Sequence, residues 1–184
     1  MLKNSKLAYR IYGALYVSMV MMSVTMLLLI APHGQQLTMM VFTLAGVASW
    51  TAIEYTMHRF VLHGPLFSRW HMAHHQRPAV LIHGTMMLSA MLIILLMILP
   101  ALLLGNVWRA VALSLGLLTG YAGYALTHQA IHHCHTDNAW LAERRRWHVQ
   151  YHHDSENTGY YGVTNAFWDH VFGSMPQTVA STSA

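Results

Sequence analysis

Four long apolar runs limit what this chain can fold into. Each is nearly free of charged side chains, and a helix needs about 20 apolar residues to cross a bilayer. Only 9% of all residues are charged and 55% are hydrophobic, whereas a soluble domain has roughly 25% charged residues. These values exclude an ordinary soluble protein, and they also exclude a disordered chain. The runs cover residues 11–31, 37–57, 81–104 and 107–127.

Short polar breaks divide the runs into two pairs. Pro32 and Gly34 fall between the first two runs, and Gly105 and Asn106 fall between the last two. Breaks of this length favour tight helical hairpins. We therefore predict an all-α integral membrane protein with four transmembrane helices in two hairpins. Residues 1–184 are expected to form a single domain, with a cytosolic, His-rich helical cap built from residues 58–80 and 128–176.

The positive charges predict the orientation in the membrane. Nine of the ten Lys and Arg residues fall on one side of the predicted bilayer, and only Arg109 falls on the other. By the positive-inside rule, that side is cytoplasmic and holds both termini. The net charge of +4 is interpreted as topology and contact with anionic lipid. Basic runs interleaved with aromatic residues are missing, so we expect no nucleic-acid partner.

Histidine is the unusual residue, with 15 copies in the chain. Most of the histidines form four spaced groups at the ends of the apolar runs, all on the predicted cytoplasmic side. The groups are His58 and His63; His71, His74 and His75; His128 and His132; and His148, His152 and His153.

The spacing of these groups has a geometric meaning. Residues three or four apart share a face of a helix, so three of the groups each form a cluster. His58 and His63 are five apart and less well aligned, and they converge only if the helix ends or bends near His63, where Gly64 and Pro65 follow.

Ten clustered imidazoles favour a metal centre with two ions. Imidazole suits Fe, Zn, Cu and Ni, and a mononuclear site uses about three or four protein ligands. The single Cys134 excludes a zinc–thiolate site and an intrachain disulfide framework. The isolated His33, His135 and His170 are interpreted as ordinary surface or structural residues.

With these four histidine groups, which we call His boxes, the chain resembles the sterol desaturase and fatty acid hydroxylase superfamily of membrane di-metal oxygenases. The opening box is Glu54-Tyr55-x-x-His58-Arg59-Phe60-x-x-His63, and the other three His groups follow in order. The closing stretch Gly162-Val163-Thr164-x3-Trp168-Asp169-x-x-Phe172-Gly173 fits the same superfamily. The opening box is most similar to the fatty acid 2-hydroxylase branch.

This resemblance implies a dioxygen-dependent hydroxylase that acts on an acyl chain of a membrane lipid. It implies two non-haem iron ions held by the ten clustered histidines, although zinc can replace iron on purification. The chain carries no cytochrome b5 motif, so the electrons are expected from a separate ferredoxin or cytochrome b5 type protein with its reductase. A bacterial cytoplasmic membrane is the expected location, and the endoplasmic reticulum is the alternative.

Three details stay open in the sequence. The last box reads H-x3-HH, whereas the 2-hydroxylase branch has H-x2-HH, and one extra residue rotates His148 by about 100° on a helix. Gln150 is therefore an alternative ligand. Glu54 is expected either to orient a ligand histidine or to pair with Arg59. Asp169 is expected to orient a ligand or to fold the cap.

Other functions remain as alternatives. A carotenoid-ring hydroxylase and a sterol or lipid desaturase belong to the same superfamily and use the same oxidant. A bis-His haem electron carrier would place histidine pairs inside the spans, often at both faces, and a metal transporter would place ligands near the midplane. Here the histidines crowd one face and the middle of each span is apolar.

Overall fold

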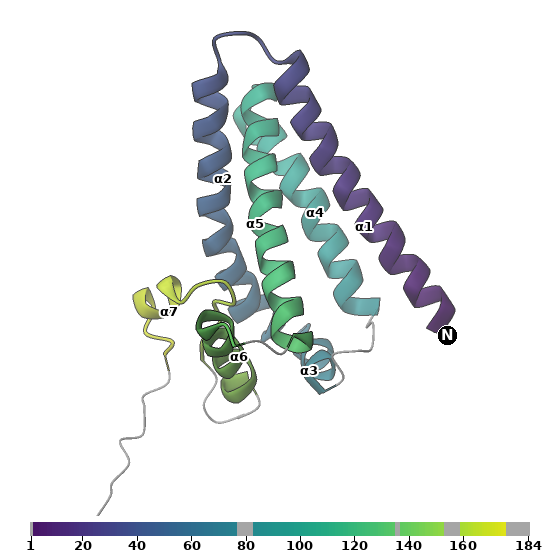
Figure 1. The fold of residues 1–184 in the computed structure, drawn as a ribbon, viewed down its shortest axis with the longest axis vertical. Helices are drawn as coiled ribbons and strands as arrows, with labels where there is room; N and C mark the ends of the chain where they lie inside the picture. Colours follow the sequence, from purple (N-terminus) through teal and green to yellow (C-terminus); the bar gives the residue numbers. More distant parts are fainter. Residues whose placement is uncertain (1, 77–82, 135–136, 153–158, 176–184) are drawn as a thin grey trace, which may run out of the picture.

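The computed structural model describes residues 2–76, 83–134, 137–152 and 159–175, and every regular element in these ranges is helical. Four long helices lie side by side, and three short ones gather at one end (Figure 1). We call the end that carries the short helices the polar end. The long helices are α1 (Leu2–Thr25), which continues as the π-helix η1 (Met26–Ile30); α2 (Gln36–Thr56), which continues as the π-helix η2 (Met57–Leu62); α4 (His83–Leu104); and α5 (Val107–His133). The short helices are α3 (Ser68–Gln76), α6 (Ala139–His152) and α7 (Phe167–Val171).

Three of the long helices are long and apolar enough to cross a membrane, namely Gly13–Ile30, Gln36–Leu62 and Val107–His133. The all-helical membrane protein expected from the sequence is therefore confirmed at this level. The remaining predicted span corresponds to α4, whose apolar stretch, Leu88–Leu104, is shorter. Large apolar side chains are exposed along α1, η1 and α2, for example Leu28, Leu29 and Leu44, as expected for surfaces that face lipid.

Two helices run past the ends of the predicted spans. The second continues to Leu62 instead of ending at residue 57, and the fourth continues to His133 instead of residue 127. A helix ends where its backbone hydrogen bonding is broken, which is not where its side chains stop being apolar. His58, His128 and His132 consequently lie on extensions of the long helices and not in a separate cap segment.

The two hairpin turns form where the sequence predicts them. Gly34 and Gly105 adopt φ values of 91° and 58°, a left-handed conformation that glycine reaches without strain. Asn106 then caps α5, because its side-chain oxygen accepts hydrogen bonds from the backbone N–H groups of Trp108 and Arg109, at 3.1 and 3.0 Å. The turns leave α2 and α5 running in the same direction, with both C-termini at the polar end (Figure 1).

Glycines allow α2 and α5 to pack closely. An added Cβ on Gly46 would lie 2.3 Å from the carbonyl oxygen of Leu113, and one on Gly116 would lie 2.0 Å from that of Thr43. One turn further along α5, Gly120 makes room for the Trp50 ring. Small residues spaced by four are a common way for membrane helices to bring their backbones together. The contact fixes the distance between the histidine-bearing ends of the two helices.

We predict that Gly116→Ala destabilises the protein by about 1–3 kcal/mol, because the added methyl group meets backbone atoms that cannot turn aside. Thermal unfolding in detergent measures the effect. Gly123→Ala is the matched control on the same helix, since nothing lies within 4 Å of its added Cβ and alanine favours helix more than glycine does. Equal melting temperatures for the two variants would contradict the close packing.

Candidate metal centre

A π-helical turn brings together the two histidines of the opening box. The N–H of His63 donates to the carbonyl oxygen of His58 at 3.1 Å, which is the bond between residues five apart that defines a π-helix. A spacing of five residues, awkward for an α-helix, therefore becomes one turn of η2. The two imidazole ring centroids lie 5.2 Å apart. Single π turns in helices are frequent at functional sites.

His71 of α3 completes this first cluster. Its ring centroid lies 5.0 Å from that of His58 and 4.8 Å from that of His63. The Nε2 atoms of His58 and His71 are 3.1 Å apart. Each of the three histidines offers a nitrogen, and these atoms all lie within 4.8 Å of one another. We call His58, His63 and His71 the first cluster.

A second cluster forms where α5 meets α6. His128 and His132 lie one turn apart near the end of α5, with their Nε2 atoms 3.3 Å apart. His148 of α6 joins them, with ring centroids 4.9 Å from His128 and 5.2 Å from His132. The three donor atoms again lie within 4.8 Å of one another. The longer last box thus still directs His148 into a cluster, where it is 2% exposed.

The two clusters adjoin each other. The ring centroids of His58 and His148, one from each cluster, are only 5.8 Å apart. Both clusters lie at the C-terminal ends of α2–η2 and α5, where the helix dipole carries partial negative charge and favours cations. Six imidazoles from four helices, in two adjacent groups of three, match the donor chemistry of two transition-metal ions.

The backbone carbonyl of Tyr161 sets the orientation of His58. It lies 2.5 Å from Nδ1 of His58, and because a carbonyl oxygen only accepts, Nδ1 carries the proton. The lone pair is therefore on Nε2, which faces His71 inside the cluster. A hydrogen bond of this kind from the second ring nitrogen is the usual support of a metal-bound histidine.

Burial also favours the neutral form of His63. It lowers the pKa of His63 below the ordinary value, because a charged imidazolium loses its hydration when it leaves water. A neutral imidazole is the form that binds a metal ion. In the second cluster, the ring of Tyr124 stacks on His128 with centroids 5.6 Å apart and limits its rotation.

Asp169 folds the C-terminal segment that supplies this carbonyl. Its fully buried carboxylate accepts hydrogen bonds from the backbone N–H groups of Tyr161 and Gly162, at 2.8 and 2.9 Å, and from the hydroxyl of Ser174 at 2.8 Å. A Cβ on Gly162 would lie 1.9 Å from the carbonyl oxygen of Asn165, so only glycine fits this turn. Of the two roles expected for Asp169, these contacts match the folding role.

The contacts of Glu54 differ from both expectations. Its carboxylate accepts from the backbone N–H of Thr164 at 2.8 Å, from the Thr164 hydroxyl at 2.6 Å and from Nε1 of Trp50 at 3.2 Å. In the described part of the chain it contacts neither a ligand histidine nor Arg59, whose guanidinium donates instead to the Tyr55 hydroxyl. Glu54 therefore ties the C-terminal segment to α2, because that segment presents donors that a buried carboxylate needs.

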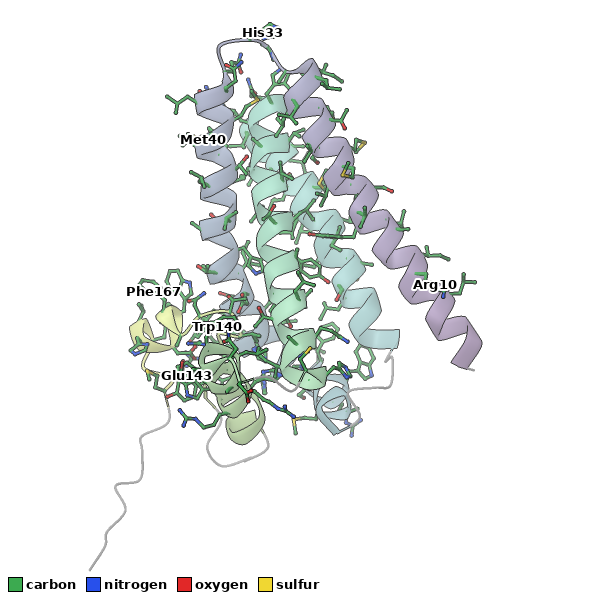
Figure 2. All side chains as sticks on the ribbon, viewed as in Figure 1. Arg10, His33, Met40, Trp140, Glu143 and Phe167 are labelled. Atoms are coloured by element: carbon green, nitrogen blue, oxygen red, sulfur yellow. The ribbon has the colours of Figure 1, made fainter. Side chains whose placement is uncertain are left out.

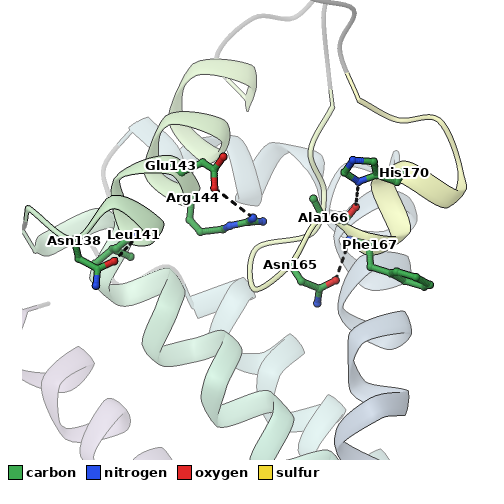
Figure 3. Close-up of polar contacts among 8 residues, drawn as sticks. All are labelled: Asn138, Leu141, Glu143, Arg144, Asn165, Ala166, Phe167 and His170. Atoms are coloured by element: carbon green, nitrogen blue, oxygen red, sulfur yellow. Dashed lines mark hydrogen bonds and ion pairs between the residues drawn. The ribbon is translucent and has the colours of Figure 1, made fainter.

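The other predicted histidines fall outside this description. His74 and His75 lie on α3 and His152 ends α6, but their side chains, like that of Gln150, are outside the described part, and His153 lies outside the described residues altogether. Of the isolated histidines, His33 and His170 stay apart from the clusters, and His135 lies outside the described residues. His33 lies at the opposite end of the bundle (Figure 2), and Nδ1 of His170 bonds the carbonyl oxygen of Ala166 at 2.8 Å (Figure 3).

The sequence alone does not predict the groups that hold the clusters in place. The carbonyl of Tyr161 is a backbone group, so no residue type marks it. The Gly162-Val163-Thr164 stretch is recognisable as a motif in the sequence. Its partners Glu54 and Asp169 become evident only in the structure, where the segment packs against α2. The signal in the sequence is a carboxylate within an apolar run, Glu54, and another within the closing motif, Asp169, in a chain with only six acidic residues.

The family follows from comparison with known proteins. The profile of the family "Fatty acid hydroxylase" matches residues 42–174, which include both clusters and the segment that supports them. The chain belongs to the fatty acid hydroxylase family. The resemblance noted in the sequence is confirmed.

Similar proteins include ceramide and fatty acid hydroxylases. The chain is 34% identical over 151 residues to the ceramide very long chain fatty acid hydroxylase scs7 of Schizosaccharomyces pombe, covering 72% of this chain and 42% of scs7. It is 33% identical over 140 residues to the dihydroceramide fatty acyl 2-hydroxylase FAH2 of Arabidopsis thaliana, covering 71% of this chain and 59% of FAH2. The chain thus spans less than two thirds of these relatives.

A solved structure shares the fold. It is that of full-length scs7p, in which only the hydroxylase domain is visible. The two chains superpose with a TM-score of 0.69 at 24% sequence identity, over 92% of this chain and 66% of that one. At this identity the likeness concerns the fold alone.

We predict that Asp169→Asn destabilises the protein by about 1–3 kcal/mol, because an amide cannot accept from all three donors and leaves one buried and unpaired. Chemical or thermal unfolding measures the change. Asp137→Asn is the control, since Asp137 is exposed and its replacement should stay within about 0.5 kcal/mol. A wild-type stability for Asp169→Asn would contradict the bracing role.

Proposed function

We propose that this chain is a dioxygen-dependent, non-haem di-iron hydroxylase that acts on the acyl chain of a membrane lipid. The observation that carries the proposal is the pair of adjoining three-histidine clusters at one end of apolar helices. Family membership supports the hydroxylase chemistry, and the similar ceramide fatty acid hydroxylase and fatty acyl 2-hydroxylase support the acyl substrate. We place the hydroxyl on the carbon next to the acyl carbonyl.

The residues present fit a pair of iron ions. Each cluster offers three imidazole nitrogens within 4.8 Å of one another, and with the proton on Nδ1 of His58 the lone pair of its ring is on Nε2. We propose the described six as ligands, together with four whose side chains lie outside the described part. The full set is His58, His63, His71, His74, His75, His128, His132, His148, His152 and His153.

Iron bound here supplies the oxidising chemistry: dioxygen, two electrons and two protons convert a C–H bond to C–OH and yield one water. The protein's own residues hold the geometry. Tyr161 and Asp169 keep the His58 ring from turning, and Glu54 keeps the supporting segment against α2. The ring of Tyr161 packs edge to face with that of His58, with centroids 6.1 Å apart. The electrons come from a separate ferredoxin or cytochrome b5 type protein and its reductase.

We also propose the arrangement in the membrane. All four long helices span the bilayer, so that residues 1–184 form one domain whose polar end is a cytosolic cap. Apolar side chains at the polar end, such as Phe60, Phe167 and Phe172, are more than half exposed and would face the bilayer interface. Figure 2 places Phe167 and Trp140 at this polar end. A bacterial cytoplasmic membrane, with the site on its cytoplasmic face, is the location we favour.

Metal content gives the first test. Protein from iron-supplemented cells should hold about two non-haem metal ions per chain, and either His71→Ala or His132→Ala should lower this number to about one. Mass spectrometry of the lipids from the same cells should detect 2-hydroxy acyl chains that disappear in both variants.

His33→Ala is the matched control, because His33 lies at the opposite end of the molecule (Figure 2). It should keep both the metal ions and the product. A haem Soret band, or a metal content that His71→Ala and His132→Ala leave unchanged, would contradict the proposal.

The single cysteine tests the orientation. Cys134 is exposed beside the second cluster, so a membrane-impermeant maleimide should label it in inside-out vesicles and leave it unlabelled in intact cells. A Cys134→Ser chain that also carries His33→Cys, at the exposed turn of the other end, should show the reverse pattern. Labelling of both chains from the same side would contradict the topology.

A further inference from the structure

Arg144 differs from the two arginines that follow it. It is only 9% exposed, whereas Arg146 is exposed. Arg144 lies on α6 one turn before His148, and residues four apart share a helix face at a separation of about 6 Å along the axis. Arg144 is therefore buried on the face of α6 that carries His148 of the second cluster.

Two of its donor atoms have no hydrogen-bond partner among the described residues. Nε and Nη1 of Arg144 are both sealed from solvent and unpartnered. Nη2 lies 3.8 Å from a carboxylate oxygen of Glu143, which is too long for a hydrogen bond. A guanidinium has five N–H donors and no acceptor, and buried donors without partners are costly. In the described part of the chain, no acceptor group occupies this position.

The neighbouring carboxylates attract the charge but do not supply that acceptor. Burial lowers the pKa of Arg144, while the charges of Glu143, Asp169 and Glu54 act in the opposite direction. The oxygens of Asp169 and Glu54 already accept hydrogen bonds from the C-terminal segment and from Trp50. These carboxylates favour the charged form of Arg144 but do not accept hydrogen bonds from its Nε or Nη1.

Aromatic stacking fixes the guanidinium plane. Its central carbon lies 4.1 Å from the centroid of the Trp147 ring, and Trp147 stacks in turn with Tyr160 at 4.5 Å and an interplanar angle of 11°. An arginine that stacks by its face still has its donors along the edge. In the view of Figure 3, the side chain extends from α6 toward the loop of Asn165 and Ala166.

We propose that Arg144 binds the carbonyl or carboxylate oxygen at the head of the acyl substrate. This inference rests on the proposed function. When a chain is hydroxylated next to its carbonyl, the oxygen lies two bonds from the reacting carbon and must be held close to the metal centre. The guanidinium of Arg144, one helical turn from His148 on α6, would hold the oxygen near the metal centre. Arg144 then sets which carbon of the chain meets the centre.

Binding without turnover tests the proposal separately from the reaction. The full chain, loaded with Zn²⁺ in a maltoside detergent, cannot oxidise its ligand. We would measure the affinity of a long-chain fatty acid, of its N-methyl amide and of an alkane of equal length. The proteins are the wild type, Arg144→Gln, Arg144→Lys and, as the matched control, Arg146→Gln.

Arg144→Gln should weaken binding of the acid and the amide by about ten- to a hundredfold, the loss expected for charge-assisted hydrogen bonds. Alkane binding should not change, and Arg146→Gln should match the wild type throughout. Arg144→Lys should restore part of the binding of the acid, because it returns the charge without the fork. A loss confined to the acid identifies a free carboxylate as the ligand, whereas a loss for both identifies an acyl carbonyl.

Unchanged affinity in Arg144→Gln, or an equal loss for the alkane, would overturn the inference while leaving the hydroxylase proposal in place. If the wild type bound none of the acyl ligands, the proposed function itself would fail. Melting temperatures without ligand add a second readout. If Arg144 is an empty binding group, Arg144→Gln should melt no lower than the wild type, whereas a purely structural counter-charge predicts a lower melting temperature.

Discussion

The close contact between α2 and α5 is the constraint on which the rest of the structure depends. Gly46 and Gly116 bring the two backbones together, and the two helices run in the same direction. Their C-terminal ends therefore meet at one place, and each end carries a pair of histidines. Because both helix dipoles point their negative ends at this place, it favours positive ions before any ligand geometry is considered.

Two buried carboxylates hold the site at these helix ends in a fixed arrangement. Glu54 and Asp169 each accept several hydrogen bonds, nearly all from the segment between Tyr161 and Ser174. An ionised carboxylate near the end of a membrane helix is costly unless its oxygens are filled. Folding that segment against α2 fills them, and the same fold places the Tyr161 carbonyl on His58. The contacts that stabilise the segment therefore also orient the His58 ring.

The sequence predicts the parts of this protein that depend on periodicity and composition. The apolar runs predict the long helices, Gly34 and Gly105 predict the turns, and the spaced histidines predict the end at which a site forms. The π turn at His58 is not predictable from spacing alone, since an α-helix and a π-helix differ by one hydrogen-bond register. The partners of Glu54 were predicted wrongly, because a side chain's hydrogen bonds depend on which distant segment folds against it. Arg144 is hidden for the same reason: three consecutive arginines look alike until a helix face is buried.

The central claim is that the two clusters each hold one metal ion. Anomalous diffraction from crystals of the iron-loaded protein, recorded on both sides of the iron absorption edge, tests it most directly. The account predicts two iron peaks, one among His58, His63 and His71 and the other among His128, His132 and His148. A single peak, or peaks away from these six residues, would contradict it.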